Sequence, residues 1–575
     1  MSSYLGGGVL LYVRELVDWD RYFRLRKGED VDVEAEKAAL VGVLETAAGI
    51  CAEIEVDARR GWEQAARLED GRVLYPDHIQ AGYDKLREAG LVSLGVEEQY
   101  GGFGLPALVT NLVIQMVARA DASLMTIVGL QTGVAEDIQQ YASEELKQQY
   151  LPRFASGEVM GAMDLTESQA GSDLGGITTR ATEEGGRFFL EGEKIFITNG
   201  GCEVHLVLAR DDDTFDASKG TTNGLSLYLC PRTLPDGTPN GVCVARLEHK
   251  LGIHGSPTAT VTFERAEAWA VGKKGDGFKA MLSLMNNARL GVAAQGIGIS
   301  EAALAAALRY ARERVQFGKP IGDQPLMKNL LARMVLALEG SRALLYRACV
   351  LVDRNRAIRV HLASHPDLNA AERADLDDLY HKNETRYRLL TPLAKYLATE
   401  HSDFITRAAI QVHGGLGFMA ESEVGKLHQD SIITTIYEGT SEIQVSFALK
   451  EIGKGALQVV FEEIGKELEG LSDPPLQEYA DKVRHGIERI LDASSALMAD
   501  FDYALLSARS LADIVIDVIV GAELLKQANV DSRRFDLAAS WINRRMLDVE
   551  ATAQRIKEGT TARIDRAERI LALVD

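Results

Sequence analysis

A carboxylate that could act as a base stands in residues 436–444, which read Ile-Tyr-Glu-Gly-Thr-Ser-Glu-Ile-Gln. Glu438 lies on a predicted turn, and a helix is expected to follow it and to end near Gly453. Ser441 and Gln444 have the spacing of a capping box, in which the two side chains satisfy backbone N–H groups at a helix start. Such a position lets Glu438 point into a cleft, whereas the alternative is a surface glutamate in a loop.

The tetrapeptide Tyr437-Glu438-Gly439-Thr440 resembles the catalytic motif of the acyl-CoA dehydrogenases, a family of FAD flavoproteins. By this resemblance, Glu438 is the base that removes the α-proton of an acyl-CoA thioester. The resemblance also implies that Gly439 contacts the substrate, and that Thr440 and Glu442 contact the cofactor.

Residues 163–174 are similar to the flavin loop of that family, written L-T-E-P-x-A-G-S-D. The resemblance implies that backbone groups of Met163 and Leu165, with the hydroxyl of Thr166, contact the polar side of the isoalloxazine ring. A flavin needs such polar groups because charge gathers there on reduction. Ser172 is expected toward the coenzyme A side.

Residues 194–201 are similar to a second flavin-contacting segment, W-I-T/S-N-G, about thirty residues further on. Phe196 replaces the common tryptophan and keeps an aromatic face while losing the indole N–H. The resemblance implies that Phe196 packs on the flavin and that the hydroxyl of Thr198 lies near its N5 atom. Taken singly, either segment could be a strand end followed by a turn.

The second half of the chain carries further family motifs. Asn286 and Arg289 correspond to a D-x-x-R motif of the coenzyme A site, with an amide in place of the carboxylate. Some family members carry their catalytic glutamate one residue before this arginine, but here that residue is Ala288, which favours Glu438 as the base. Other residues are implied at the FAD pyrophosphate and adenine end, reached from a neighbouring subunit: Arg314, Phe317, Gln411, Gly414 and Gly415.

Composition and charge limit the classes of partner. The chain has 575 residues, of which 46% are hydrophobic and 26% are charged, as in ordinary globular proteins. A formal net charge of −21 argues against nucleic acid or an anionic membrane as a partner. The five cysteines include no C-x-x-C pair, so we expect reduced thiols, no metal site and a cytoplasmic protein. No apolar run suggests membrane insertion, and no signal peptide is expected.

The elements that must position these residues follow from periodicity, which predicts an α+β multidomain protein. Helical spacing fills residues 1–158, strand-like alternation fills 159–272, and helical spacing returns in 273–455 and in 456–575. We therefore expect an N-terminal helical domain, a middle antiparallel β domain, a four-helix bundle and an additional C-terminal helical domain.

An insertion at 354–386 and the C-terminal extension resemble the large acyl-CoA dehydrogenases, including those that act on 3-methylmercaptopropionyl-CoA. In such members the extension is expected to cover a surface used for tetramer assembly, so a homodimer is favoured over a tetramer. Arg533, Arg534, Arg544 and Arg545 of the extension could form a basic patch, although a solvated helix face is the more common role of such residues.

The function implied is FAD-dependent conversion of an acyl-CoA to the trans-2-enoyl-CoA, as in fatty acid metabolism. The proton would go to Glu438 and the hydride to flavin N5, and electron-transfer flavoprotein is implied as the acceptor. Two alternatives remain open: an acyl-CoA oxidase that uses O2, and a non-enzymatic or DNA-associated flavoprotein on the same fold. Sequence leaves the acyl chain unassigned.

Overall fold

The computed structural model of the chain describes residues 4–471, 473–497 and 500–574. These residues form two compact units, each built from segments that are distant in sequence. The first unit comprises residues 4–5, Gly42–Ala303 and Gly415–Thr434, and the second comprises Gly6–Val41, Leu304–Gly414 and the chain from Thr435 onward. Residues 6–41 thus belong with the C-terminal helices rather than with the helices that follow them in sequence.

The first unit begins with helices that pack around an apolar core. Asp121 caps α6 by accepting hydrogen bonds from Ser123 N and Leu124 N, and Ser143 caps α7. Helix α5 is buried along almost its whole length, as its apolar sequence requires. The helical elements are α3 (Val33–Gly61, which begins in the second unit), α4 (Asp77–Glu88), α5 (Ala107–Ala120), α6 (Ala122–Tyr141), α7 (Glu144–Ala155), α8 (Phe215–Ser218) and α12 (Glu423–Ile432).

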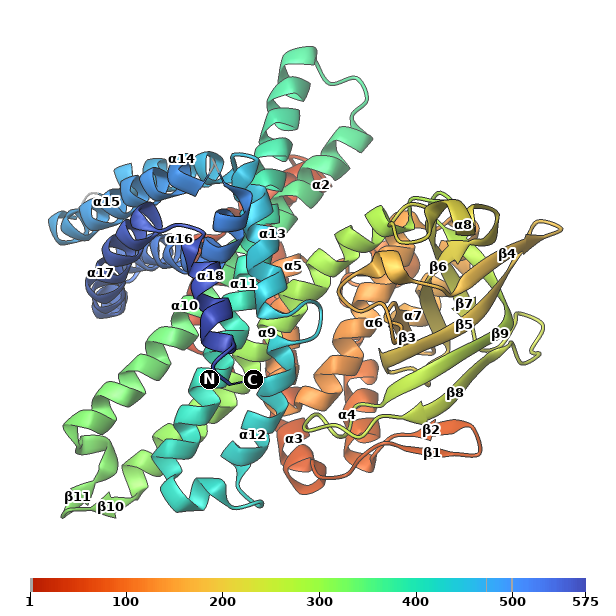
Figure 1. The fold of residues 1–575 in the computed structure, drawn as a ribbon, viewed down its shortest axis with the longest axis horizontal. Helices are drawn as coiled ribbons and strands as arrows, with labels where there is room; N and C mark the ends of the chain where they lie inside the picture. The colour runs from red at the N-terminus through yellow and green to blue at the C-terminus, as the bar shows by residue number, and fades with distance from the viewer. Residues whose placement is uncertain (1–3, 472, 498–499, 575) are drawn as a thin grey trace. The chain divides into compact units, whose positions relative to one another are not determined.

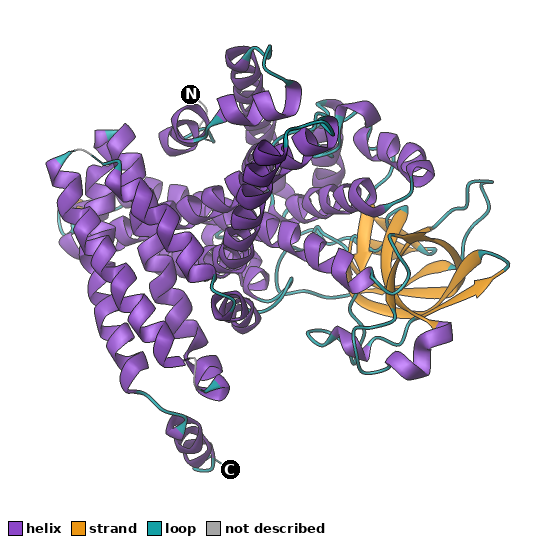
Figure 2. Cartoon of the chain, turned by 90° about the horizontal axis from the view of Figure 1, so that it is seen from above, coloured by secondary structure: helices purple, strands orange, loops and turns teal. Residues whose placement is uncertain are grey.

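The β domain is a closed barrel (Figure 2). Going round it, β4 pairs with β5, β5 with β9, β9 with β7, β7 with β6, and β6 again with β4. Most neighbouring strands pair antiparallel, as the sequence predicts, whereas β6 pairs in parallel with both β3 and β4. The strands are β3 (Gly161–Asp164), β4 (Arg180–Glu184), β5 (Arg187–Thr198), β6 (Val204–Asp211), β7 (Leu225–Pro231), β8 (Val242–Leu247) and β9 (Thr258–Val271).

Strand β5 differs from what its local sequence predicts. The sequence around Gly192 suggests a turn between two strands, but β5 runs through it as one strand with register shifts on both sides. Gly192 has φ 151°, and a Cβ there would lie 2.6 Å from the Thr179 hydroxyl. Gly192 itself pairs in regular register with Phe263, so glycine at this position allows a close backbone approach rather than a reversal. A separate hairpin, β1 (Arg67–Glu69) with β2 (Arg72–Leu74), lies in a region where helix alone is expected from sequence.

The second unit is built on two long helices, α10 (Pro325–Ser364) and α11 (Ala370–His413), which form an antiparallel hairpin (Figure 1). The insertion at 354–386 lengthens both arms of this hairpin. Helix α13 (Ser441–Gly453) packs on α11 and ends where the glycines predict. The N-terminal elements and a small hairpin complete this part: α1 (Gly7–Leu11), the π-helix η1 (Tyr12–Leu16), α2 (Trp19–Lys27), β10 (Val315–Gln316) and β11 (Lys319–Pro320).

The C-terminal extension is wholly helical in its described residues. Helices α15 (Pro474–Leu497), α16 (Phe501–Val530) and α17 (Phe535–Glu558) pack on one another, and α14 (Ala456–Glu469) lies against α11 and α16. The last helix, α18 (Ala562–Leu571), buries none of its residues. Three of the four arginines of the possible basic patch are paired with carboxylates: Arg533 with Asp531, Arg534 with Glu339 and Arg545 with Asp517.

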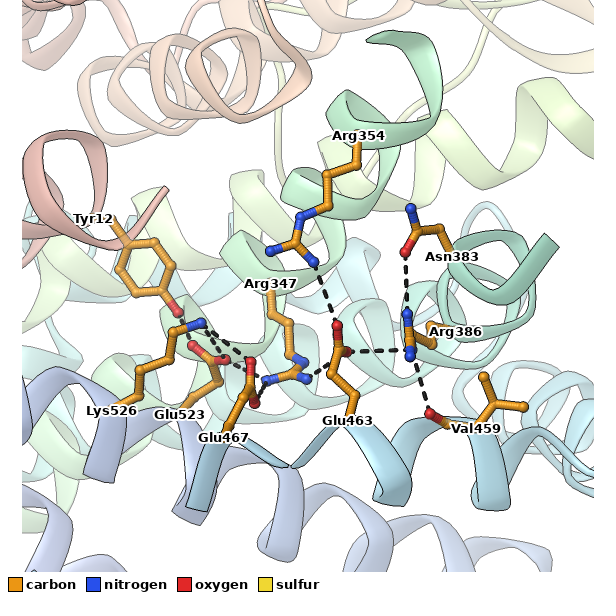
Figure 3. Close-up of polar contacts among 10 residues, drawn as sticks. All are labelled: Tyr12, Arg347, Arg354, Asn383, Arg386, Val459, Glu463, Glu467, Glu523 and Lys526. Atoms are coloured by element: carbon orange, nitrogen blue, oxygen red, sulfur yellow. Dashed lines mark hydrogen bonds and ion pairs between the residues drawn. The ribbon is translucent and has the colours of Figure 1, made fainter. Parts of the chain in front are cut away.

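A buried ionic cluster joins the extension to α10 (Figure 3). The Arg347 guanidinium contacts three carboxylates, at 2.7 Å from Glu463, 2.8 Å from Glu467 and 2.5 Å from Glu523. The phenol of Tyr12, from the N-terminal segment, donates a hydrogen bond to Glu523. Burial and the Glu523 carboxylate raise the pKa of Tyr12, so the phenol keeps the proton that it donates. Three distant parts of the chain therefore meet at one cluster.

Helix α9 (Gly277–Glu313), which contributes to both units, is long and apolar enough to span a membrane by length and composition. The expectation that the chain has no such apolar stretch needs this correction. Within its most apolar window, 89% of the helix is buried inside the protein. A core helix of this kind passes the same test.

Candidate active site

The backbone of Glu438 is held in an unusual conformation directly before α13. Glu438 has φ 55° and Gly439 has φ 96°, both in the left-handed region. For a residue with a Cβ this region costs roughly 1–2 kcal/mol, so other contacts must maintain it. Glu438 is half-buried. The turn therefore fixes where Glu438 leaves the backbone.

Three hydrogen bonds from two fully buried side chains hold this turn. The Gln444 Nε2 atom donates to the carbonyl oxygens of Glu438 and Gly439, each at 2.9 Å. The Lys395 Nζ atom, from α11, donates to the Gly439 carbonyl at 2.8 Å. Such contacts meet the carbonyls that a turn would otherwise leave without donors. The geometry indicates a side chain whose position is specified rather than a loose surface glutamate.

The expected capping box is wrong. The residue that caps α13 is Thr440, which makes no side-chain cap bond. The Gln444 amide turns toward the two carbonyls of the preceding turn, and the Ser441 hydroxyl donates to Glu400 Oε1 at 2.6 Å. Glu442, predicted at the cofactor, is engaged by Arg509 at 2.7 Å. The roles of Thr440, Glu442 and Gly439 toward ligands remain predictions.

In the first unit, the loop after β3 carries Met163, Leu165 and Thr166. Met163 lies in the strand and is buried, whereas Leu165 and Thr166 follow it and are half-buried. Ile195 N donates to the Thr166 carbonyl oxygen at 2.9 Å. The structure thereby brings together the two segments that resemble flavin-binding motifs. Ser172, further along the loop, is exposed.

A buried ion pair, which sequence reasoning missed, braces this loop. Lys194 is fully buried, and its ammonium donates to Glu167 Oε1 at 2.9 Å, to the Leu165 carbonyl at 2.9 Å and to the Leu208 carbonyl at 2.8 Å. The Glu167 carboxylate also accepts from the backbone and hydroxyl groups of Thr178 and Thr179. The available indication in the sequence was a lysine directly before the apolar run Ile195-Phe196-Ile197.

The electrostatics of the pair follow from its partners. Burial alone raises the pKa of the Glu167 carboxyl, but the Lys194 ammonium and the hydrogen bonds from Thr178 and Thr179 outweigh it and bring the pKa to about 2. Burial lowers the pKa of Lys194, and Glu167 offsets part of that effect. The Glu167 carboxyl is therefore ionised at neutral pH, and hydrogen bonds satisfy both of its oxygens.

Phe196 stands on a bulge of β5, between register positions Lys194 and Ile197. It has φ 60° and is 59% exposed. An exposed aromatic ring on left-handed backbone gains little from burial, so its conformation suggests a functional constraint. Thr198 lies two residues further along the same strand and is half-buried.

These residues fit a flavin. The hydroxyls of Thr166 and Thr198 make no hydrogen bond to any other described residue, so both can bind a ligand. The Phe196 ring offers an exposed aromatic face. Its neighbour Ile195 is hydrogen-bonded through its backbone N–H to the Thr166 carbonyl oxygen. A planar heteroaromatic ring with a polar edge needs both kinds of contact.

Asn286 and Arg289 meet on α9. Arg289 is 3% exposed, and its Nη1 atom donates to Asn286 Oδ1 at 2.9 Å. The amide thus takes the place of a carboxylate as acceptor for the guanidinium. The role of Asn286 and Arg289 toward coenzyme A remains a prediction.

Two of the residues predicted at the far end of FAD, Arg314 and Phe317, lie on an exposed loop. Arg314 is exposed, and Phe317, on the hairpin between β10 and β11, is 94% exposed with φ 55°. The Tyr310 and His413 rings stack with centroids 4.4 Å apart, so the ends of α9 and α11 that lead into these loops lie together. His413 therefore takes part in the packing between these two helices.

Glycine is required at the end of α11. Gly414 has φ 62° and ψ −137°, a conformation that only glycine adopts readily. A Cβ on Gly414 or on Gly415 would meet nothing within 4 Å, so the space beside both is open. Gln411, three residues earlier, is also exposed. The open backbone suits the close approach of another molecule.

Comparison with known proteins shows the class. Family models described as acyl-CoA dehydrogenase N-terminal, middle and C-terminal domains match residues 54–158, 162–266 and 275–453. The chain is 31% identical to 3-methylmercaptopropionyl-CoA dehydrogenase of Ruegeria pomeroyi over 87% of this chain and 84% of that protein. It is 34% identical to the short-chain specific acyl-CoA dehydrogenase of Megasphaera elsdenii over 63% of this chain and 88% of that protein.

Solved structures agree. Butyryl-CoA dehydrogenase from Megasphaera elsdenii has a TM-score of 0.59 at 28% identity, covering 73% of this chain and 98% of that one. An acyl-CoA dehydrogenase from Bacillus anthracis complexed with FAD shares the fold along 97% of this chain and 93% of that one, with a TM-score of 0.73 at 24% identity. The fold and the fitted site define an FAD-dependent oxidoreductase. The chain belongs to the acyl-CoA dehydrogenase family.

Proposed function

We propose that this chain dehydrogenates an acyl-CoA thioester between its α and β carbons, with Glu438 as the base that takes the α-proton. The observation that carries the proposal is the turn itself, in which two buried side chains hold the backbone of one glutamate in left-handed geometry. A base held in one orientation does not lose conformational entropy when it approaches the α-proton. General base catalysis typically raises the reaction rate about 10²–10⁴-fold. When bound, FAD supplies the acceptor for the hydride.

The remaining residues have binding and orienting roles in this proposal. Met163, Leu165, Thr166, Phe196 and Thr198 hold the flavin ring, with Lys194 and Glu167 keeping their loop in place. Arg289 and Asn286, with Ser172, serve the coenzyme A moiety. Arg314 suits a diphosphate because a guanidinium pairs with two phosphate oxygens at once.

The proposal also covers the substrate and the electron acceptor. The relatives named above act on acyl-CoA thioesters and are dehydrogenases, which favours a dehydrogenase over an oxidase. An electron transferring flavoprotein structure of Acidaminococcus fermentans matches 72% of this chain at 28% identity, which supports such a flavoprotein as electron acceptor. Anaerobic titration with acyl-CoAs of different chain length, followed by flavin absorbance, identifies the substrate.

We also propose a cytoplasmic homodimer. The exposed Phe317 and Arg314 on one hairpin, and the open space beside Gly414, suit a second copy of the chain. All five cysteines are free thiols, which suits a reducing compartment. Light scattering that gives a tetramer would contradict the dimer.

Exchange of Glu438 for glutamine tests the base. Glu438→Gln should keep the bound flavin and its absorbance spectrum while kcat falls by about 10²-fold or more, because the amide cannot accept the proton. Glu462→Gln, at an exposed position of α14, is the matched control and should leave kcat unchanged. Turnover of Glu438→Gln close to that of the unaltered protein would reassign the base.

A further inference from the structure

Helix α16 of the C-terminal extension reaches the first turn of α13. The Nη1 atom of Arg509 lies 2.7 Å from Glu442 Oε1, and its Nη2 atom lies 2.9 Å from Glu400 Oε2. Glu442 is four residues after Glu438, and Glu400 belongs to α11. The Arg509 guanidinium of the extension therefore joins α13, the helix that follows Glu438, to α11.

The second oxygen of Glu400 completes the link to the turn. It accepts the hydrogen bond of the Ser441 hydroxyl at 2.6 Å. Since Thr440 supplies no side-chain cap, the start of α13 is fixed through Ser441 and Glu442 by groups from α11 and α16. Carboxylates are favourable at a helix N-terminus, and the guanidinium balances the repulsion between the two.

A second set of contacts joins the same turns of α11 and α16. The Tyr396 hydroxyl donates to Asp513 Oδ1 at 2.8 Å, and the Arg509 guanidinium lies over the Tyr396 ring at 5.3 Å from its centroid. Tyr396 directly follows Lys395, whose ammonium holds the Gly439 carbonyl. The extension thus contacts α11 at Tyr396, next to the residue of α11 that donates to the backbone after Glu438.

We propose that Arg509 is a positioning residue for Glu438, so that the C-terminal extension sets the geometry of the base. The proposal rests on the function proposed above. Arg509 and its two carboxylates are partly exposed, and exposed ion pairs contribute only about 0–1 kcal/mol to stability. Loss of Arg509 should therefore affect the placement of the turn more than the stability of the fold.

The test compares Arg509→Met with Arg489→Met in the holoenzyme. Arg489, on α15, also pairs with two carboxylates, Glu550 at 2.9 Å and Asp492 at 3.5 Å, within the extension and away from α13. Arg509→Met should lower kcat about tenfold with KM little changed, since small displacements of catalytic groups are costly. It should also speed amide hydrogen exchange in residues 434–444. Arg489→Met should change neither quantity.

Two further variants make the result decisive. Arg509→Lys keeps the charge and should recover part of the lost kcat. Ser441→Ala removes only the hydroxyl link and should raise exchange in the same peptide, which keeps the test open if Arg509→Met folds poorly. Unchanged kcat and exchange in Arg509→Met, or equal changes in Arg489→Met, would overturn the proposal. If the unaltered protein turned over no acyl-CoA, the proposed function would fail, and the exchange comparison would still decide the role of Arg509.

Discussion

Lys395 and Gly439 are joined by a 2.8 Å hydrogen bond across 44 residues of sequence. The donor is fully buried on α11, and the acceptor is the carbonyl oxygen directly after the residue proposed as the base. A charged donor makes a stronger hydrogen bond than a neutral one. The backbone of Glu438 is therefore specified from outside its own helix.

Replacing Lys395 with methionine tests this relationship. Lys395→Met keeps most of the side-chain volume and removes the ammonium, so the turn should relax and kcat should fall by roughly 10–100-fold. Steady-state kinetics with an acyl-CoA that the unaltered protein uses would measure the change. Lys450→Met, at an exposed position of α13, should have no effect. Equal kcat in both variants would show that the ammonium does not position the turn.

The buried pair behind the flavin loop predicts a large loss of stability in Lys194→Met. Removing one partner of a buried ion pair typically costs about 3–5 kcal/mol, and here the Leu165 and Leu208 carbonyls would lose their donor too. The midpoint of urea denaturation should fall clearly, and FAD should bind more weakly. Lys279→Met, which breaks an exposed pair with Asp276, should shift the midpoint little. A midpoint equal to that of the control would contradict the prediction.

The Glu167 carboxylate predicts that the protein loses folding stability at acid pH. Its folded pKa of about 2 lies below the usual 4.5, so its carboxylate contributes stability that is present above pH 4.5 and is lost as pH falls toward 2. The contribution is at most about 3 kcal/mol, and burial of the Lys194 ammonium reduces the net value of the pair. Denaturation midpoints measured from pH 6 to pH 3 should decline less steeply in Glu167→Gln than in the unaltered protein. Identical slopes would assign the acid loss to other carboxylates.

The cluster around Arg347 predicts that this arginine holds the C-terminal extension in place on α10. Arg347→Met would remove the guanidinium that contacts Glu463, Glu467 and Glu523. The free energy of unfolding should fall by several kcal/mol, because breaking a buried ion pair typically costs about 3–5 kcal/mol. Limited proteolysis should then cut within 456–574 at lower protease concentration. Lys382→Met, in an exposed pair with Asp378, is the matched control. Equal resistance in the two variants would show that apolar packing alone holds the extension.

Local sequence predicts the features that depend on local physics. The helix after Glu438 and its end at Gly453 follow from helical periodicity and glycine, and the change to strand-like alternation after residue 158 marks the β domain. The resemblance adds the residues of the site, and the structure brings two of its segments together through the Ile195–Thr166 bond.

Contacts between distant residues could not be predicted in the same way. The spacing of Ser441 and Gln444 satisfies a capping box, but Glu400 competes for the Ser441 hydroxyl and two carbonyls compete for the Gln444 amide. At Gly192, the local sequence cannot show that Thr179 lies against the backbone, a contact that leaves no room for a side chain. The parallel pairings of β6 likewise depend on strands that are far apart in the chain.

Phe196 keeps an exposed ring on backbone that glycine or asparagine would adopt at lower cost. Selection for thermal stability alone would therefore act against this residue, because removing the strain forfeits little buried surface. The proposed role of Phe196 at the flavin would explain why the residue is kept, because the strain would then be offset in the bound state. If that role holds, programmes that stabilise this enzyme by consensus or directed evolution should leave position 196 unchanged, since a gain in melting temperature there would weaken flavin binding.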